Sequence, residues 1–133
     1  GKANILTEGK DIAIIACGTM VHKSMEAADL LRAGKLEAAI IDMHTIKPID
    51  TDIIDEVSKS SKLIVTVEEH SIIGGLGSAV SEHLSTLNQK PPLLSIGIPD
   101  EYGKAGSYKS LLKKRLLLPH QIANTIANRY FSI

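Results

Sequence analysis

Short hydrophobic runs alternate with longer amphipathic stretches along this chain, and polar, glycine- or proline-containing breaks separate them. Four of the runs are rich in aliphatic residues and short, which is typical of strands in a sheet that is covered on both faces. They comprise residues 11–17, 36–43, 63–67 and 93–98. The run at 11–17 is almost continuously apolar, so we expect that strand to be fully buried.

The amphipathic stretches carry apolar residues at helical spacing and predict helices. Gly34 is placed to end the first helix, Asp50 and Ser107 are placed to cap two others, and Pro119 suits the first turn of the last. The predicted helices comprise residues 20–33, 50–58, 76–87, 107–116 and 119–130. On the first helix, the face predicted to be buried carries Val21, Met25, Ala28 and Leu31.

A fifth strand is predicted at residues 3–7, before the first buried run. The turn signal at residues 8–11 lies between two β-prone segments and predicts a hairpin, with residues 3–7 as an edge strand antiparallel to the next strand. The alternation of strands and helices that follows indicates a mostly parallel sheet covered on both faces. We therefore predict a three-layer α/β/α fold.

The stretch from 62 to 84 combines a strand, a polar break at 68–71 and the glycine cluster 74–77, which opens a helix. Such a turn exposes backbone N–H groups that can hold an anion, so an anion- or nucleotide-binding module is one hypothesis. The dinucleotide fingerprint is incomplete, because Val80 takes the place of its third glycine. The glycines favour a close approach to a neighbouring chain or domain. Candidate residues of this anion or interface turn are Glu69, His70, Gly74, Gly75, Gly77 and Ser78.

Glu68, Glu69 and His70 follow a predicted strand at its carboxyl end, where acid–base residues often lie. If the strand continued through them, the two carboxylates would point to opposite faces and would not converge. We therefore favour a solvated or interface-facing role over catalysis.

Other chemistry finds little support in the sequence. The histidines lack metal-binding spacing, and Ser78 lacks the G-x-S-x-G frame of a nucleophile elbow. Cys17 is interpreted as a small core residue, and as the single cysteine it fits a reducing compartment. The sequence predicts no catalytic, cofactor-binding or metal-binding residue.

Length and composition narrow the class of protein. A chain of 133 residues predicts one domain, residues 1–133, and 44% hydrophobic residues with 3% aromatics predict an aliphatic core. Fifteen basic and fifteen acidic residues cancel, which disfavours nucleic-acid and membrane-surface binding.

No apolar run approaches the roughly 20 residues needed to span a bilayer, and no signal peptide is evident. We expect a cytoplasmic protein, and the Gly-Lys start without Met indicates a piece of something longer or a tag remnant.

Four sequence blocks together resemble the C-terminal domain of the transketolase family, and the resemblance covers nearly the whole chain. The blocks are IAIIACGTMV at 12–21, IDMHTIKPID at 41–50, VEEHSIIGGLGS at 67–78 and IGIPD at 96–100. The chain looks closest to the C-terminal section of split transketolases. It is similar, more distantly, to deoxyxylulose-phosphate synthase and to the β subunits of 2-oxo acid dehydrogenases, which stay open as alternatives.

The resemblance implies a five-stranded mixed sheet whose first strand is antiparallel. It also implies a larger enzyme of the pentose phosphate pathway that moves a two-carbon ketol unit between sugar phosphates with thiamine diphosphate and Mg²⁺. In that family the cofactor lies between the pyrimidine- and diphosphate-binding domains at a homodimer interface. The C-terminal domain would support the pyrimidine-binding domain and the dimer, and would be inactive alone.

Two positions depart from the family pattern. Leu118 precedes Pro119 where relatives commonly have Thr, and the loss of that helix cap should cost on the order of 1 kcal/mol. Ser110 stands where Glu would complete a capping box after Ser107. Both departures concern local stability.

Overall fold

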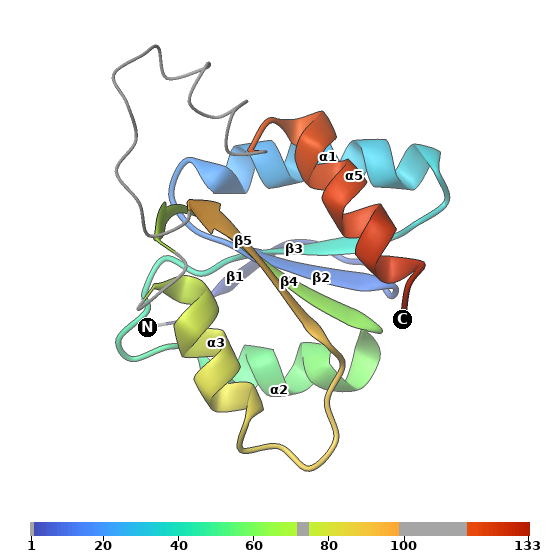
Figure 1. The fold of residues 1–133 in the computed structure, drawn as a ribbon. Coiled ribbons are helices and arrows are strands. Elements are labelled where there is room, and N and C mark those ends of the chain that lie inside the picture. Colours follow the sequence, from blue (N-terminus) through green and yellow to red (C-terminus); the bar gives the residue numbers. More distant parts are fainter. Residues whose placement is uncertain (1, 72–74, 99–116) are drawn as a thin grey trace.

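The computed structural model describes residues 2–71, 75–98 and 117–133. In this part of the chain, a five-stranded sheet with strand order β1-β3-β2-β4-β5 is covered by helices on both faces (Figure 1). Helices α1 and α5 cover one face, and α2 and α3 cover the other. The elements are β1 (Asn4–Thr7), β2 (Ile12–Ala16), α1 (Met20–Ala33), β3 (Ala38–Asp42), α2 (Thr51–Ser60), β4 (Leu63–Ser71), α3 (Leu76–Leu84), β5 (Leu93–Ile98) and α5 (Pro119–Tyr130).

The predicted fold class is confirmed. All pairs within β3-β2-β4-β5 are parallel, and β1 is antiparallel. The bounds of α1 and β5 agree with the prediction, and all five residues of β2 have no exposed surface. The short helix predicted after Ser107, with the capping position Ser110, lies outside the described residues.

The edge strand β1 pairs with β3 and not with β2. Both edges of β2 are occupied by parallel strands, β3 on one side and β4 on the other. The chain passes from β1 to β2 over the start of β3, where a Cβ atom on Gly9 would lie 2.4 Å from the carbonyl carbon of Ala38. The predicted hairpin is therefore wrong, although the predicted edge position and antiparallel direction are right.

Alternate residues of the buried strands feed two separate hydrophobic cores. Ile12 and Ile14 pack toward α1 and α5, and Ala13 and Ile15 pack toward α2 and α3. Each isoleucine that is fully withdrawn from water contributes roughly 1.5–3 kcal/mol, so the aliphatic strands hold both layers in place. The aliphatic core that the composition predicted is thereby confirmed.

The buried face of α1 differs from the predicted one. Met25 is 38% exposed and Val21 is only partly buried, whereas Ser24 is completely buried. The buried residues follow one helical stripe, namely Met20, Ser24, Ala27, Ala28 and Leu31. The hydropathy of the sequence predicted a different face of the helix, because a serine is buried here and a methionine is exposed. The C-cap at Gly34 is confirmed, but the left-handed residue at this end is Lys35, with φ 67°.

The start of α5 lacks a side-chain cap, as predicted from Leu118. The Leu118 N–H donates to the Gln121 side-chain oxygen at 3.2 Å, which satisfies the backbone just before Pro119. Leu118 itself packs against the core formed by α1 and α5. A threonine there would therefore gain a cap and lose apolar contact.

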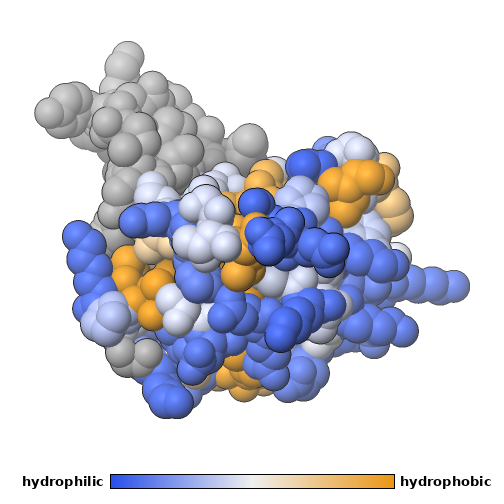
Figure 2. Space-filling model, turned by 90° about the horizontal axis from the view of Figure 1, so that it is seen from below, coloured by the Kyte–Doolittle hydropathy of each residue, from blue (hydrophilic) through white to orange (hydrophobic). Residues whose placement is uncertain are grey.

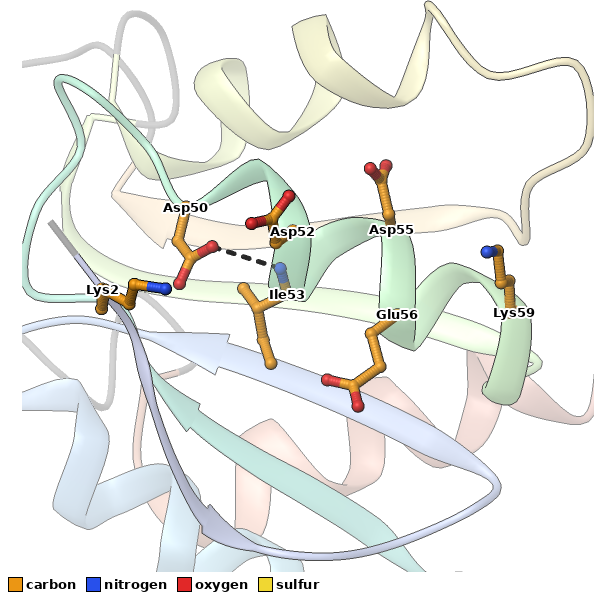
Figure 3. A pocket seen from close by; sticks show the side chains of 7 residues that line it. All are labelled: Lys2, Asp50, Asp52, Ile53, Asp55, Glu56 and Lys59. Atoms are coloured by element: carbon orange, nitrogen blue, oxygen red, sulfur yellow. Dashed lines mark hydrogen bonds between the residues drawn. The ribbon is translucent and has the colours of Figure 1, made fainter.

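The outer surface of α2 and α3 is mostly hydrophilic, with hydrophobic residues in separate patches (Figure 2). An open depression of about 590 Å³ beside α2 is lined by acidic side chains and two lysines (Figure 3). The residues lining it are Lys2, Asp50, Asp52, Ile53, Asp55, Glu56 and Lys59. Within the described residues, no helix is long and apolar enough to cross a membrane.

Asp50 caps α2, as predicted, and also holds the start of the chain. One carboxylate oxygen accepts from the Ile53 N–H at 3.2 Å, and the other accepts from the Ala3 N–H at 2.9 Å. Figure 3 shows the first of these bonds, with the Lys2 side chain pointing toward the carboxylate. The hydrogen bond from Ala3 is the largest cause that lowers the pKa of Asp50, and it outweighs the opposing effect of burial.

We expect Asp50→Ala to lower the free energy of unfolding by about 1 kcal/mol at pH 7, because a helix cap is lost. Since the pKa of Asp50 is lower in the folded state, its contribution is present above the unfolded pKa of about 3.9 and is lost as the pH falls through the folded pKa. Urea unfolding at pH 7 and at pH 3 measures this. The deficit of the variant should shrink at pH 3, whereas Glu56→Ala, an exposed change on the same helix, should stay within about 0.5 kcal/mol of the parent. A deficit that is equal at both pH values would contradict the assignment.

Candidate functional site at the carboxyl edge of the sheet

The strand order reverses direction between β2 and β4, which lie side by side at the centre of the sheet. The chain leaves β2 through α1 on one face and leaves β4 toward α3 on the other. In open α/β sheets, the crevice outside the carboxyl ends of two such strands is where ligands usually bind. The described candidate residues lie at the carboxyl end of β4 or at the start of α3, and so at this edge.

Strand β4 is longer than predicted and runs on to Ser71. The polar break predicted at residues 68–71 is therefore wrong. The extension is paired, because Ser71 lies opposite Ile98 of β5, beyond a register irregularity that follows Val67. Because side chains alternate along a strand, Glu68 and Glu69 point to opposite faces of the sheet, so their carboxylates do not converge.

Glu68 is a buried carboxylate and is only 1% exposed. It accepts hydrogen bonds from the N–H groups of Leu76 at 2.8 Å and Gly77 at 2.7 Å, the first residues of α3. The prediction for this carboxylate was a solvated or interface-facing role, and its burial contradicts the solvated alternative. An anion at a helix N-terminus is stabilised both by the unpaired N–H groups and by the helix dipole. An internal anion thus already occupies these two donors, which disfavours an external phosphate on the same N–H groups.

Gly77 lets α3 approach its own sheet. A Cβ atom there would lie 2.9 Å from Ser95 Oγ, 3.1 Å from Thr66 Oγ1 and 3.3 Å from the Glu68 carboxylate. The sequence predicted a close approach to a neighbouring chain or domain, whereas the close neighbours of Gly77 in this structure are two strands of the same domain. Gly75 is the N-cap residue and Ser78 lies within the first turn, while Gly74 lies outside the described residues.

Glu69 makes its contact on the other face of the sheet. Its carboxylate accepts a hydrogen bond from the Thr19 hydroxyl at 2.6 Å. Thr19 is the N-cap residue of α1 and follows Gly18, whose φ of 61° turns the chain sharply after β2. Glu69 thereby joins the carboxyl end of β4 to the start of α1, and sequence reasoning did not foresee a role for Thr19.

Cys17 lies between β2 and this turn and is partly buried against the core that faces α2 and α3. Burial raises the pKa of its thiol, and the negative charges of Glu68 and then Asp42 raise it further. The thiol is therefore kept protonated, which fits the small core residue predicted from the sequence better than a nucleophile.

Within the described ranges, no group of three or more His, Cys, Asp or Glu residues lies close enough to hold a metal ion. His83, another of the histidines, joins α3 to α2 through Asp55, with 2.7 Å between Nε2 and Oδ1. The contacts of Glu68, Glu69 and His83 therefore order the starts of α1 and α3 and the packing of α3 on α2.

Comparisons with known proteins point to one family. The profile of the family "Transketolase, C-terminal domain" matches residues 1–122. The chain is 43% identical over 130 residues to a 1-deoxy-D-xylulose-5-phosphate synthase of Chlorobium luteolum, which covers 98% of this chain and 21% of that protein. It is 44% identical over 126 residues to a putative transketolase C-terminal section of Methanocaldococcus jannaschii, covering 95% of this chain and 39% of that protein.

Solved structures agree with these matches. A split gene transketolase, determined as an inactive β4 tetramer, matches with a TM-score of 0.89 at 38% identity, over 96% of this chain and 41% of that one. The transketolase from Campylobacter jejuni matches with a TM-score of 0.69 at 16% identity, over 95% of this chain and 18% of that one, which shows a shared fold alone. This chain spans about a fifth to two fifths of the length of these proteins.

Proposed function

Because this chain belongs to the transketolase C-terminal domain family, we propose that residues 1–133 form one domain of a larger thiamine diphosphate- and Mg²⁺-dependent enzyme that transfers a two-carbon ketol unit between sugar phosphates. The observation that carries this proposal is the similarity to transketolase sections: 44% identity to a putative transketolase C-terminal section, and a TM-score of 0.89 at 38% identity to a split gene transketolase. Within the described residues, no group of three or more His, Cys, Asp or Glu lies close enough to hold Mg²⁺. Cofactor binding and the chemical step would fall to the other domains.

This domain would support the pyrimidine-binding domain and take part in the dimer contact. We infer that the turn formed by Glu69, His70, Gly74, Gly75, Gly77 and Ser78 faces the pyrimidine-binding domain. Its position at the strand-order reversal and the contacts of Glu68 and Glu69 support this placement. The complete enzyme would be a cytoplasmic homodimer of the pentose phosphate pathway.

An apolar groove on the face of the sheet that α1 and α5 cover also supports a role of this domain in contacts with other parts of the enzyme. It lies between α1 and α5, has a volume of about 250 Å³ and is flanked by Leu30 and Phe131. These two side chains are 49% and 72% exposed. Exposed apolar patches of this kind often mark contact surfaces.

A second candidate function has a specific observation in its favour. The relative from Chlorobium luteolum is named 1-deoxy-D-xylulose-5-phosphate synthase, and its identity to this chain, 43%, is close to that of the transketolase section. The complete enzyme could therefore form 1-deoxy-D-xylulose 5-phosphate instead of transferring ketol units between sugar phosphates. The two functions share the cofactor and differ in product.

The proposal is tested with the 133-residue chain and with the complete enzyme that carries it. The chain alone, supplied with thiamine diphosphate, Mg²⁺ and sugar phosphates, is expected to show no turnover, and measurable turnover would overturn the supporting role. The complete enzyme is expected to transfer ketol units between sugar phosphates. Formation of 1-deoxy-D-xylulose 5-phosphate would replace the first function with the second.

A further inference from the structure

Helices α1 and α3 both begin at the edge where β2 and β4 end, and both lack stabilising groups of their own at the N-terminus. Neither has an acidic residue in its first turn, and neither N-cap residue, Thr19 or Gly75, makes a side-chain capping hydrogen bond to its own helix. A helix N-terminus carries partial positive charge and unpaired N–H groups, so both helices lack a stabilising anion in their own sequence.

Two adjacent residues of β4 bring carboxylates to these helix starts from opposite faces of the sheet. Ile64 belongs to the core that faces α2 and α3, and Val65 and Val67 belong to the core that faces α1 and α5. By alternation, Glu68 continues the face of Ile64 and Glu69 continues the face of Val67. Each carboxylate therefore points toward the layer that contains its helix.

The contacts agree with this alternation. Glu68 is buried and accepts from the first two N–H groups of α3 at 2.8 and 2.7 Å. Glu69 reaches the N-cap residue of α1 and accepts from the Thr19 hydroxyl at 2.6 Å. One dipeptide thus ties the starts of two helices, one in each layer, to a single central strand.

We propose that Glu69 is a positioning residue that, with Glu68 on the opposite face, sets the spacing between the start of α1 and the start of α3. This proposal rests on the proposed function, because that spacing defines the edge on which the cofactor-binding domain would dock. Glu68 is the buried member of the pair, and we expect its removal to lower the stability of the fold. The Thr19–Glu69 hydrogen bond is exposed and contributes little to stability, so its role is to fix geometry.

The test compares four variants of the complete enzyme, Thr19→Val, Thr19→Ser, Glu69→Ala and the double variant Thr19→Val/Glu69→Ala. Glu82→Ala, an exposed change on α3, is the matched control. The readouts are the apparent affinity for thiamine diphosphate, kcat at saturating cofactor and the denaturation midpoint of the 133-residue chain.

Thr19→Val and Glu69→Ala are expected to weaken the apparent affinity for thiamine diphosphate roughly fivefold or more, the scale of typical coupling between sites. We expect kcat at saturating cofactor and the denaturation midpoint to stay near the parent values. Because both changes remove the Thr19–Glu69 hydrogen bond, the double variant should weaken the affinity by less than the product of the two single effects. Thr19→Ser keeps the hydroxyl and should behave like the parent.

The outcomes separate this proposal from the proposed function. If the parent enzyme catalyses neither reaction, the proposed function fails. If the parent is active and Thr19→Val and Glu69→Ala match Glu82→Ala, the positioning role fails while the function stands. A large fall in the denaturation midpoint with Thr19→Val would also overturn it, since the bond would then be structural.

Discussion

Replacing Glu68 with glutamine is expected to lower the free energy of unfolding by about 2–3 kcal/mol, although the side chain keeps its shape. The carboxylate accepts from two N–H groups at the start of α3, and both of its oxygens are used. A glutamine offers one oxygen and one NH₂ group, so one helix N–H would face another donor. The site is 1% exposed, so water cannot readily take the place of the missing acceptor.

The expected cost has two sources. Hydrogen bonds to a charged group contribute about 1.5–3 kcal/mol, and a buried donor left without a partner costs about 1–3 kcal/mol. The negative charge at the helix N-terminus is lost as well. These effects overlap because they concern the same N–H groups, so their sum is not expected.

Urea unfolding of the 133-residue chain measures the effect, with Glu82→Gln as the control. Glu82 carries the same group on the exposed surface of α3, so its replacement should change stability by less than about 0.5 kcal/mol. A second readout is the reactivity of Cys17, whose pKa is raised by burial and then by the charge of Glu68. Glu68→Gln should therefore lower that pKa and speed alkylation of the thiol in the native state. Equal stability of the two glutamine variants would contradict the stabilising role of Glu68.

The layers of the fold could be predicted because they depend on local periodicity. Apolar runs of β-branched residues and amphipathic stretches between them fixed the order of elements, and Asp50 and Gly34 marked helix ends through capping chemistry that acts within a few residues. The hypothesis that the carboxylates of Glu68 and Glu69 would not converge, if the strand continued through them, also followed from period-two alternation. These features need no knowledge of distant contacts.

The parts that were missed depend on partners far away in the sequence. Strand β1 pairs with β3 because β3 and β4 already occupy both edges of β2. Nothing in the local sequence of residues 3–11 shows which strands pair with β2. Glu68 interrupts the hydrophobic pattern, so it suggested a break, yet donors eight and nine residues further on allow it to be buried within the strand. One signal was available: the first turns of α1 and α3 lack acidic residues, and Glu68 and Glu69 contact the starts of these helices from β4.

Replacing Gly9 with alanine is expected to lower the free energy of unfolding by roughly 3 kcal/mol or more, at the upper end of the cost of overpacking. A Cβ atom on Gly9 would lie 2.4 Å from the Ala38 carbonyl carbon and 2.5 Å from the Ala39 nitrogen. Both are backbone atoms at the start of β3, so no side chain can rotate away. Relief requires the crossing segment to move off the sheet.

That movement would break contacts which hold the crossing in place. The Asp11 and Ile12 N–H groups donate to the Glu37 carbonyl at 3.0 and 3.1 Å, and the Glu37 N–H donates to the Asp11 carboxylate at 2.8 Å. The expected loss therefore includes part of the pairing of β1 with β3. Hydrogen exchange should show β1 amides losing protection first, while β4 keeps its protection.

Two other glycines make matched controls for the same substitution. Gly34 has a φ of −91° and only ordinary contact at 3.4 Å, so Gly34→Ala should be neutral or stabilise by about 0.4–1 kcal/mol. Gly18 has open space around it but a φ of 61°, so Gly18→Ala should cost about 1 kcal/mol through backbone strain alone. Urea unfolding should thus rank the alanine variants Gly34, Gly18, Gly9 from most to least stable. If Gly9→Ala unfolds no more easily than Gly18→Ala, the crossing over β3 is looser than these distances require, and the close backbone contact does not explain why glycine occupies this position.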